Sequence, residues 1–186
     1  MKRTFDLLLS IVLLVFLAAP MLIISIAVCI SSEGPVLYWS DRVGKNNKIF
    51  KMPKFRSMLV NTPTIATHLL DNPEAYLTPI GGFLRRTSFD EIPQLFSVLK
   101  GDMSFVGPRP ALFNQKDLID LRIEKGINDL SPGITGWAQV NGRDDLSIPD
   151  KVALDVEYLN RKSFWFDIKI LLMTVLSIAK REGVSH

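Results

Sequence analysis

The sequence has few of the residues that build disulfides and metal centres. Its 186 residues include one cysteine, Cys29, and two histidines, His68 and His186. A single cysteine excludes an internal disulfide and a cysteine-based zinc site. Two histidines argue against a histidine-ligated metal and a histidine-based catalytic triad. Any metal is therefore expected to be a hard cation held by oxygen ligands.

Excess charge of one sign is also small. The chain has 22 basic and 19 acidic residues, a formal net charge of +3, and a pI near 9.0. This mildly basic balance fits an anionic membrane surface or a phosphate substrate. It is too weak to indicate nucleic acid, and no nucleic-acid motif is present. Nucleic acid is not an expected partner.

One long hydrophobic run stands out near the N-terminus. Residues 7–30 contain no charged side chain. As a straight helix they would measure ~36 Å, enough to cross a bilayer core of ~30 Å. A cleaved signal peptide, a single-pass anchor and a re-entrant hairpin are the competing interpretations. The signal peptide is disfavoured because the run continues past Pro20, where cleavage would fall.

Two features favour the hairpin. Pro20 lies in the middle of the run, where it removes a helix hydrogen bond. Basic residues flank the run on both sides: Lys2 and Arg3 before it, and Arg42, Lys45, Lys48, Lys51, Lys54 and Arg56 after it. Positive charge tends to stay on the cytoplasmic side, so a straight span would place one basic flank outside. We predict a re-entrant membrane hairpin over residues 1–35 that breaks at Pro20, with Ser10 or Ser25 bonding the freed backbone groups.

The remaining residues, 36–186, are expected to form one membrane-associated domain, mainly α with a small β-hairpin (an α+β fold). Residues 36–39 and 48–50 predict two short strands around a turn. Residues 164–181 have apolar side chains at helical spacing, opened by aromatic and closed by basic residues. This helix can pack on the core, lie in the membrane interface, or do both. Short amphipathic helices of this kind are expected around the functional site.

The most informative stretch is residues 85–110, RRTSFDEIPQLFSVLKGDMSFVGPRP. Residues 92–100 predict a short amphipathic helix, which places Asp90 near its N-cap and Glu91 in its first turn. Both are favourable there for helix stability alone, and Ser88 with Glu91 matches a capping box. Taken by themselves, these two carboxylates fit a helix cap better than a chemical site.

Arginines on both sides of the pair favour a phosphate site instead. Arg85 and Arg86 lie one helical turn before it, and Arg109 follows on a stiff loop between two prolines. Arginine is suited to bidentate phosphate recognition. These arginines, with the helix N-terminus, are expected to favour the ionised form of Asp90. Such a carboxylate can hold Mg²⁺ against phosphates or attack phosphorus itself, and two adjacent carboxylates can divide those roles.

A second segment, residues 132–145 (PGITGWAQVNGRDD), is rich in glycine and amide groups. This composition suits backbone contact with a ligand, although surface turns use the same residues.

Together, SFDEIPQLFSVLKGDMSFVGPRP, PGITGWAQVNGR and the KR-x-x-D start at Lys2, Arg3 and Asp6 resemble the signature of a known family. This family is that of the monotopic polyprenyl-phosphate phosphoglycosyl transferases, which are the bacterial initiating sugar transferases. The chain is similar to the small, minimal members over nearly its whole length. The resemblance implies a re-entrant helix broken at a proline, matching Pro20, in the bacterial inner membrane. Residues 36–186 would then form the cytoplasmic catalytic domain.

The resemblance also implies the site residues. Asp90 matches a nucleophilic aspartate and Glu91 the glutamate that follows it, and both are candidate Mg²⁺ ligands. The candidate substrate- and phosphate-binding residues are Arg85, Arg109, Lys54 in KFRSM and Asp155 in LDVEY. For Lys54 and Asp155, an ordinary surface charge or a structural ion pair remains the alternative. For Glu91, the alternative is helix capping.

The implied reaction moves a phosphosugar from a UDP-sugar to undecaprenyl phosphate through a phosphosugar-aspartyl intermediate, releasing UMP. It would be the first membrane step in assembling a glycoprotein, O-antigen or capsule. Two alternatives stay open: a hydrolase of UDP-sugars or lipid phosphates that uses the same carboxylates, and a non-catalytic membrane-anchored interaction module. A homodimer also stays open, since the helices could pack on a second copy. The sequence does not name the sugar.

Overall fold

The computed structural model describes residues 1–63, 71–142 and 146–180. The chain is mostly helical with two small sheets, which confirms the α+β prediction. The helices are α1 (Lys2–Ser31), α2 (Gly81–Arg86), α3 (Gln94–Lys100), α4 (Lys116–Glu124), α5 (Trp137–Val140), α6 (Ile148–Arg161) and α7 (Phe164–Lys180). The strands are β1 (Leu37–Val43), β2 (Ile49–Phe55), β3 (Ser104–Val106) and β4 (Gly133–Thr135). Short 3₁₀ turns are η1 (Lys45–Asn47), η3 (Pro73–Tyr76), η4 (Phe89–Glu91) and η5 (Ile127–Asp129).

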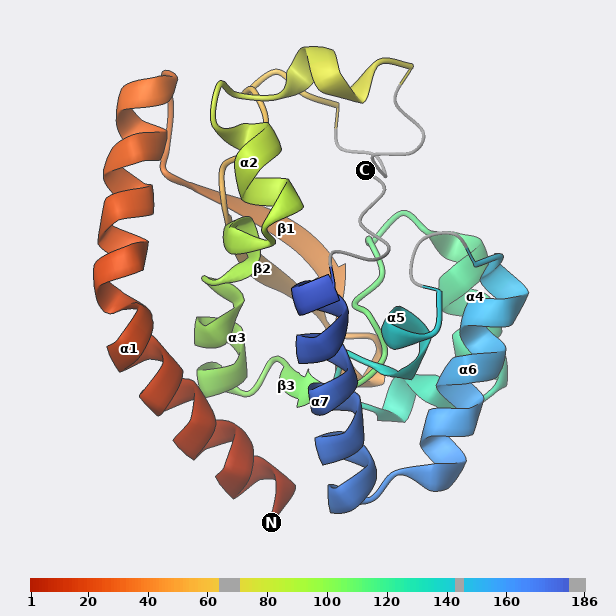
Figure 1. The fold of residues 1–186 in the computed structure, drawn as a ribbon. Helices are drawn as coiled ribbons and strands as arrows, with labels where there is room; N and C mark the ends of the chain where they lie inside the picture. Colours follow the sequence, from red (N-terminus) through yellow and green to blue (C-terminus); the bar gives the residue numbers. More distant parts are fainter. Residues whose placement is uncertain (64–70, 143–145, 181–186) are drawn as a thin grey trace.

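Figure 1 shows α1 along one side of the molecule, with α2 and α3 beside it. Helices α4, α5 and α6 lie toward the opposite side, and α7 lies between the two groups. The main core joins β2, α3, β3, α6 and α7. Its most completely buried side chains include Val98 and Ile170, both 0% exposed.

The apolar run forms one continuous helix, α1, where a break at Pro20 was predicted. The helix passes through Pro20, and Figure 1 shows it bending along its length. Proline removes one helical hydrogen bond, and a helix can absorb that loss as a bend. Ser25 donates to the carbonyl of Met21 at 2.7 Å, and Ser10 donates to carbonyls in its own turn. Neither bonds the carbonyl that Pro20 leaves free, that of Phe16, so that part of the prediction is wrong.

The outward side of α1 is apolar and exposed. Among the described residues, α1 is the one helix long and apolar enough to cross a membrane. Its exposed large hydrophobic residues are Leu8, Ile11, Val12, Val15, Phe16, Leu22, Ile23, Ile26 and Ile30. An apolar face of this extent is unusual on a soluble surface and fits contact with lipid.

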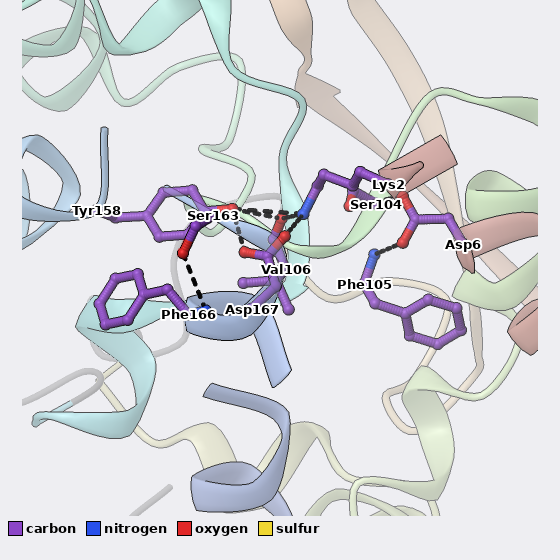
Figure 2. Close-up of polar contacts among 9 residues, drawn as sticks. All are labelled: Lys2, Asp6, Ser104, Phe105, Val106, Tyr158, Ser163, Phe166 and Asp167. Carbon is purple, nitrogen blue, oxygen red and sulfur yellow. Dashed lines mark hydrogen bonds and ion pairs between the residues drawn. The ribbon is translucent and has the colours of Figure 1, made fainter. Parts of the chain in front are cut away.

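The polar residues at the start of α1 fasten it to the rest of the domain. Lys2 donates to Asp167 of α7 at 2.5 Å, and the Tyr158 hydroxyl of α6 donates to the same carboxylate at 2.7 Å. Asp6, 4% exposed, accepts from the Ser104 hydroxyl of β3 at 2.8 Å. These five residues form what we call the N-terminal clasp, which Figure 2 shows in close-up. The KR-x-x-D motif thus has a structural role at the base of α1.

The other end of α1 is held by the same domain. Arg56, which follows β2, donates to the carbonyls of Ser32 at 2.8 Å and Gly34 at 3.3 Å, and also to that of Glu33. A buried arginine is stable when several acceptors satisfy its donors. Both ends of the apolar helix are therefore fixed to one globular domain.

Strands β1 and β2 form the predicted antiparallel hairpin, and both are longer than predicted. The register runs from Leu37 opposite Phe55 to Val43 opposite Ile49. The turn between them places Asn46 and Asn47 at positive φ, a conformation that asparagine tolerates better than most residues.

A second sheet, β3 paired in parallel with β4, was not predicted. It joins the stretch of residues 85–110 to the glycine-rich segment of residues 132–145, which lies far from it in sequence. A Cβ on Gly133 would lie 2.2 Å from the backbone nitrogen of Gly107, so the two backbones can approach only because neither residue has a side chain. These glycines are needed for packing between the motifs.

Helix α7 packs on the core with one side, as its sequence allows, and exposes apolar residues on the other. Phe166 and Ile170 are buried in the core. Its opposite side exposes Trp165, Leu172, Val175, Leu176 and Ile178. Residue 181, the predicted end of this helix, lies outside the described residues, as do residues 143–145 of the second motif.

Candidate active site

Asp90 lies in a tight turn rather than at a helix cap. The turn η4 starts after Ser88, whose φ of 57° puts a residue with a side chain in the left-handed region. Helix α3 begins at Gln94, two residues later than predicted. Within these described elements, neither η4 nor α3 has a side-chain cap hydrogen bond. The capping box of Ser88 and Glu91 does not form, so capping does not explain the carboxylate pair.

Burial, more than the neighbouring cations, sets the protonation of Asp90. The side chain is 7% exposed, and this burial raises the pKa of Asp90 to about 6. Lys54, Arg85 and Arg109 act in the opposite direction, while the charge of Glu91 adds to the increase. From the sequence we expected the arginines to determine the protonation state of Asp90. They instead limit an increase that burial causes, and leave Asp90 mainly ionised at pH 7.

Glu91 lies between two of the predicted cations. Its Oε1 atom lies 2.7 Å from Lys54 Nζ and 3.8 Å from Arg109 Nη2. The Lys54 and Glu91 side chains are only 16% and 15% exposed, so solvent screens their attraction weakly. Strand β2, turn η4 and the loop after β3 thus meet at one carboxylate. The structure brings together Lys54, Arg85, Asp90, Glu91 and Arg109, as the resemblance implied.

A small hollow opens beside the pair. It is lined by Arg42, Met52, Lys54, Glu91, Gln94, Arg109, Pro110, Gly133 and Ile134. Three of these were predicted site residues, and Gly133 comes from the second motif. The hollow is therefore cationic around one carboxylate, which suits a phosphate group.

Arg42 belongs to this site, although sequence reasoning counted it only as a basic flank. It donates to the carbonyl of Pro110 at 3.0 Å and to the Ser40 hydroxyl at 2.9 Å. Burial, helped by the neighbouring charge of Arg109, lowers the pKa of Arg42 to about 10. At pH 7 it still carries its charge beside Arg109.

Asp155 lies apart from this group. It is 1% exposed on α6, and its Oδ2 atom accepts from Nε and Nη2 of Arg122 at 2.9 and 2.7 Å. Burial raises the pKa of Asp155, and the charge and hydrogen bonds of Arg122 oppose that increase. The structure thus places Asp155 in an ion pair, the alternative left open by the sequence.

The protein itself offers a metal few ligands. Within the described ranges, no group of three or more histidine, cysteine or acidic residues is placed to hold an ion. Mg²⁺ is often bound by one or two carboxylates and completed by substrate phosphates and water. Asp90 and Glu91 fit this way of binding Mg²⁺, in which most of the ligands come from substrate and water.

The chain matches the family model described as bacterial sugar transferase over residues 1–181. It is 41% identical over 198 residues to the undecaprenyl-phosphate glucose phosphotransferase of Komagataeibacter xylinus, covering 100% of this chain and 36% of that protein. It is 41% identical over 183 residues to the UDP-glucose:undecaprenyl-phosphate glucose-1-phosphate transferase of Escherichia coli, covering 94% and 39%. An uncharacterized sugar transferase of Bacillus subtilis is 41% identical, over 100% of this chain and 91% of that protein.

The chain therefore belongs to the bacterial sugar transferase family, which confirms the resemblance seen in its motifs. It spans less than two fifths of the length of the Komagataeibacter and Escherichia relatives, and most of the Bacillus one.

Proposed function

We propose that this chain transfers a phosphosugar from a UDP-sugar to undecaprenyl phosphate, with Asp90 as the nucleophile. One observation carries the proposal: a buried carboxylate lies among Lys54, Arg85 and Arg109, next to a cationic hollow. Such a site attracts phosphates and keeps a reactive carboxylate out of bulk water. The activities for which the Komagataeibacter and Escherichia relatives are named support the same reaction class.

In the first step, an Asp90 oxygen attacks the β-phosphorus of the donor. A bond forms between that oxygen and phosphorus, and the bond to the bridging oxygen breaks. UMP leaves with the electron pair, and the phosphosugar stays on Asp90. Lys54 and Arg109 offset the negative charge of the phosphates as it redistributes.

In the second step, a phosphate oxygen of undecaprenyl phosphate attacks the same phosphorus. The bond to Asp90 breaks, the carboxylate is restored, and a polyprenyl diphosphate sugar leaves. No bond to the anomeric carbon breaks in either step, so the configuration of the sugar is kept.

Asp90 and Glu91 would hold Mg²⁺ together with the donor phosphates. When bound, the ion would neutralise phosphate charge and polarise the phosphorus centre. The contact of Glu91 with Lys54 at 2.7 Å fixes the Glu91 carboxylate beside Asp90 before the donor arrives.

The way in which α1 is held supports a proposal for its arrangement in the membrane. Its N-terminal clasp and the Arg56 contacts fix both ends to one domain, while its outer side is apolar. A helix that crossed the bilayer straight would have to separate these ends across the membrane. We infer that α1 enters and leaves the cytoplasmic face of the bacterial inner membrane, and that α7 lies at the interface beside it.

The proposal is tested by a UMP-release screen across a panel of UDP-sugars, with undecaprenyl phosphate, Mg²⁺ and the full chain in lipid nanodiscs. One or a few donors should give UMP together with a lipid-linked sugar. Free phosphosugar in place of the lipid-linked product would indicate the hydrolase. The absence of UMP with every donor would indicate the non-catalytic module.

A further inference from the structure

The loop that carries Arg109 is held almost entirely through its carbonyl groups. Pro108 and Pro110 have no N–H to donate, so the backbone here cannot be fixed by the usual donors. Instead, the carbonyl of Pro108 accepts from the Gly133 nitrogen at 2.9 Å, and that of Ala111 accepts from the Val43 nitrogen at 3.0 Å. The carbonyls of Arg109 and Pro110, which lie between these two, accept from arginine side chains.

Arg122 supplies the bond to Arg109 itself. Its Nη1 donates to the Arg109 carbonyl at 2.8 Å, while Nε and Nη2 both donate to Asp155. The Arg122 side chain is 12% exposed and the Asp155 side chain 2%, so the pair is shielded from water. The planar guanidinium can make both contacts at once because its donors point in fixed directions.

We propose that Arg122 and Asp155 are positioning residues that aim Arg109 at the donor phosphates. Asp155 orients the guanidinium of Arg122, Arg122 fixes the Arg109 carbonyl, and the Arg109 side chain is then directed toward Glu91, 3.8 Å away. This rests on the proposed function, since it gives Arg109 the phosphates as its ligand. It accounts for a buried aspartate on α6 that does not reach the Asp90 group.

Lysine in place of Arg122 separates this role from simple charge. A lysine keeps a cation beside Asp155, but one ammonium cannot hold both Asp155 and the Arg109 carbonyl in the same planar geometry. The Arg122→Lys variant is therefore expected to fold, but its Arg109 side chain should no longer be held in the orientation that binds the phosphates. Misplacing a substrate-orienting group by about 1 Å typically costs on the order of 100-fold in rate.

A double-mutant cycle on the full chain in nanodiscs tests the proposal, with kcat/KM for UMP release measured per mole of folded protein. Arg122→Lys and Asp155→Asn should each lower kcat/KM by roughly 10- to 100-fold. In an Arg109→Gln background, each should lower it by less than about 2-fold, because the residue on which they act is already lost. Lys125→Gln, at the exposed end of the helix that carries Arg122, is the control and should leave kcat/KM unchanged.

Equal losses in both backgrounds would overturn the proposal, since Arg122 and Asp155 would then act independently of Arg109. Unchanged activity in Arg122→Lys and Asp155→Asn would overturn it as well. A wild-type chain that releases no UMP from any donor would instead refute the proposed function, and this inference with it.

Discussion

At the scale of single residues, Asp90 shows a conflict between burial and charge. The side chain is 7% exposed, yet the proposed reaction needs it ionised. Three cations limit the cost of burying the ionised carboxylate, but burial still raises the pKa of Asp90 to about 6. A reactive group kept in a poorly solvated position at the expense of stability is a common feature of enzyme sites.

This conflict predicts that Asp90→Asn removes activity but stabilises the metal-free fold. The ordinary pKa of the group is 3.8, so the folded state binds the proton more tightly and loses stability as pH rises from 3.8 to 6. The neutral amide avoids that loss. In EDTA at pH 7 the variant should gain up to about 3 kcal/mol, and below pH 4 the gain should vanish. Chemical unfolding across this pH range measures the difference in the free energy of unfolding between the variant and wild type.

Asp41→Asn is the control for that measurement. Asp41 is 43% exposed in a surface pair with Lys51, so the change should stay within about 0.5 kcal/mol at every pH. If Asp90→Asn is no more stable than wild type at pH 7, the charged carboxylate is not destabilising as we describe.

The flanking arginines predicted a phosphate site at Asp90 and Glu91, and the motif resemblance added Lys54. The two carboxylates by themselves fitted a helix cap better. Arg42 was missed because the strands were predicted too short. In the observed register Tyr38 lies opposite Lys54 and Arg42 opposite Phe50. Alternate residues of a strand share a face, so a hairpin extended to Val43 places Arg42 on the same face as Lys54.

At the scale of elements, the β3–β4 pair lay beyond sequence reasoning. Each strand has three residues, too few for a detectable period, and the partners are separated by α4 and η5. What reveals the pair is a close approach of two backbones. Glycine composition alone, as in residues 132–136, does not distinguish such packing from a ligand loop.

Gly133→Ala should therefore disrupt both fold and activity. Its Cβ would lie 2.2 Å from the Gly107 nitrogen and 2.3 Å from the Thr135 carbonyl oxygen. Because these are backbone atoms, the strands must separate, at a cost of about 1–3 kcal/mol or more. In α2, Gly82→Ala meets nothing closer than 3.7 Å and should be neutral or slightly stabilising. Thermal unfolding and UMP release of the two variants check this, and equal behaviour would contradict it.

The N-terminal clasp gives a second prediction at this scale. Lys2→Met leaves the Asp167 carboxylate, 8% exposed, without its cation, although Tyr158 still donates to it. Because the Lys2 side chain is 41% exposed, we expect a loss of about 1–2 kcal/mol rather than the full cost of a buried pair. Lys51→Met breaks an exposed pair and should cost less than about 0.5 kcal/mol. Similar losses in the two variants would show that the clasp adds nothing.

At the scale of the whole molecule, the sequence predicted where the long apolar segment lies, but not that its helix stays continuous. Charge on both flanks and a central proline pointed to a return to the same face. The structure adds that α1 packs along the domain and that both its ends are fastened there. Tertiary contacts of this kind are not visible in hydropathy.

Single cysteines placed at Thr4 and Lys45 in a Cys29→Ser background test the topology. Both positions are exposed, and they flank the apolar helix. If α1 is re-entrant, an impermeant maleimide added outside intact cells should label neither cysteine, while the same reagent should label both in inside-out vesicles. Labelling of one position from outside would establish a straight crossing.

The identity of the nucleophile is tested most directly by incubating the chain with its UDP-sugar and Mg²⁺ but no lipid acceptor. Wild type should release close to one UMP per active site and gain the mass of a phosphosugar, which peptide mapping places on Asp90. Asp90→Asn should release no UMP and gain no mass. An active wild type with no adduct on Asp90, or UMP release that persists in Asp90→Asn, would contradict the account.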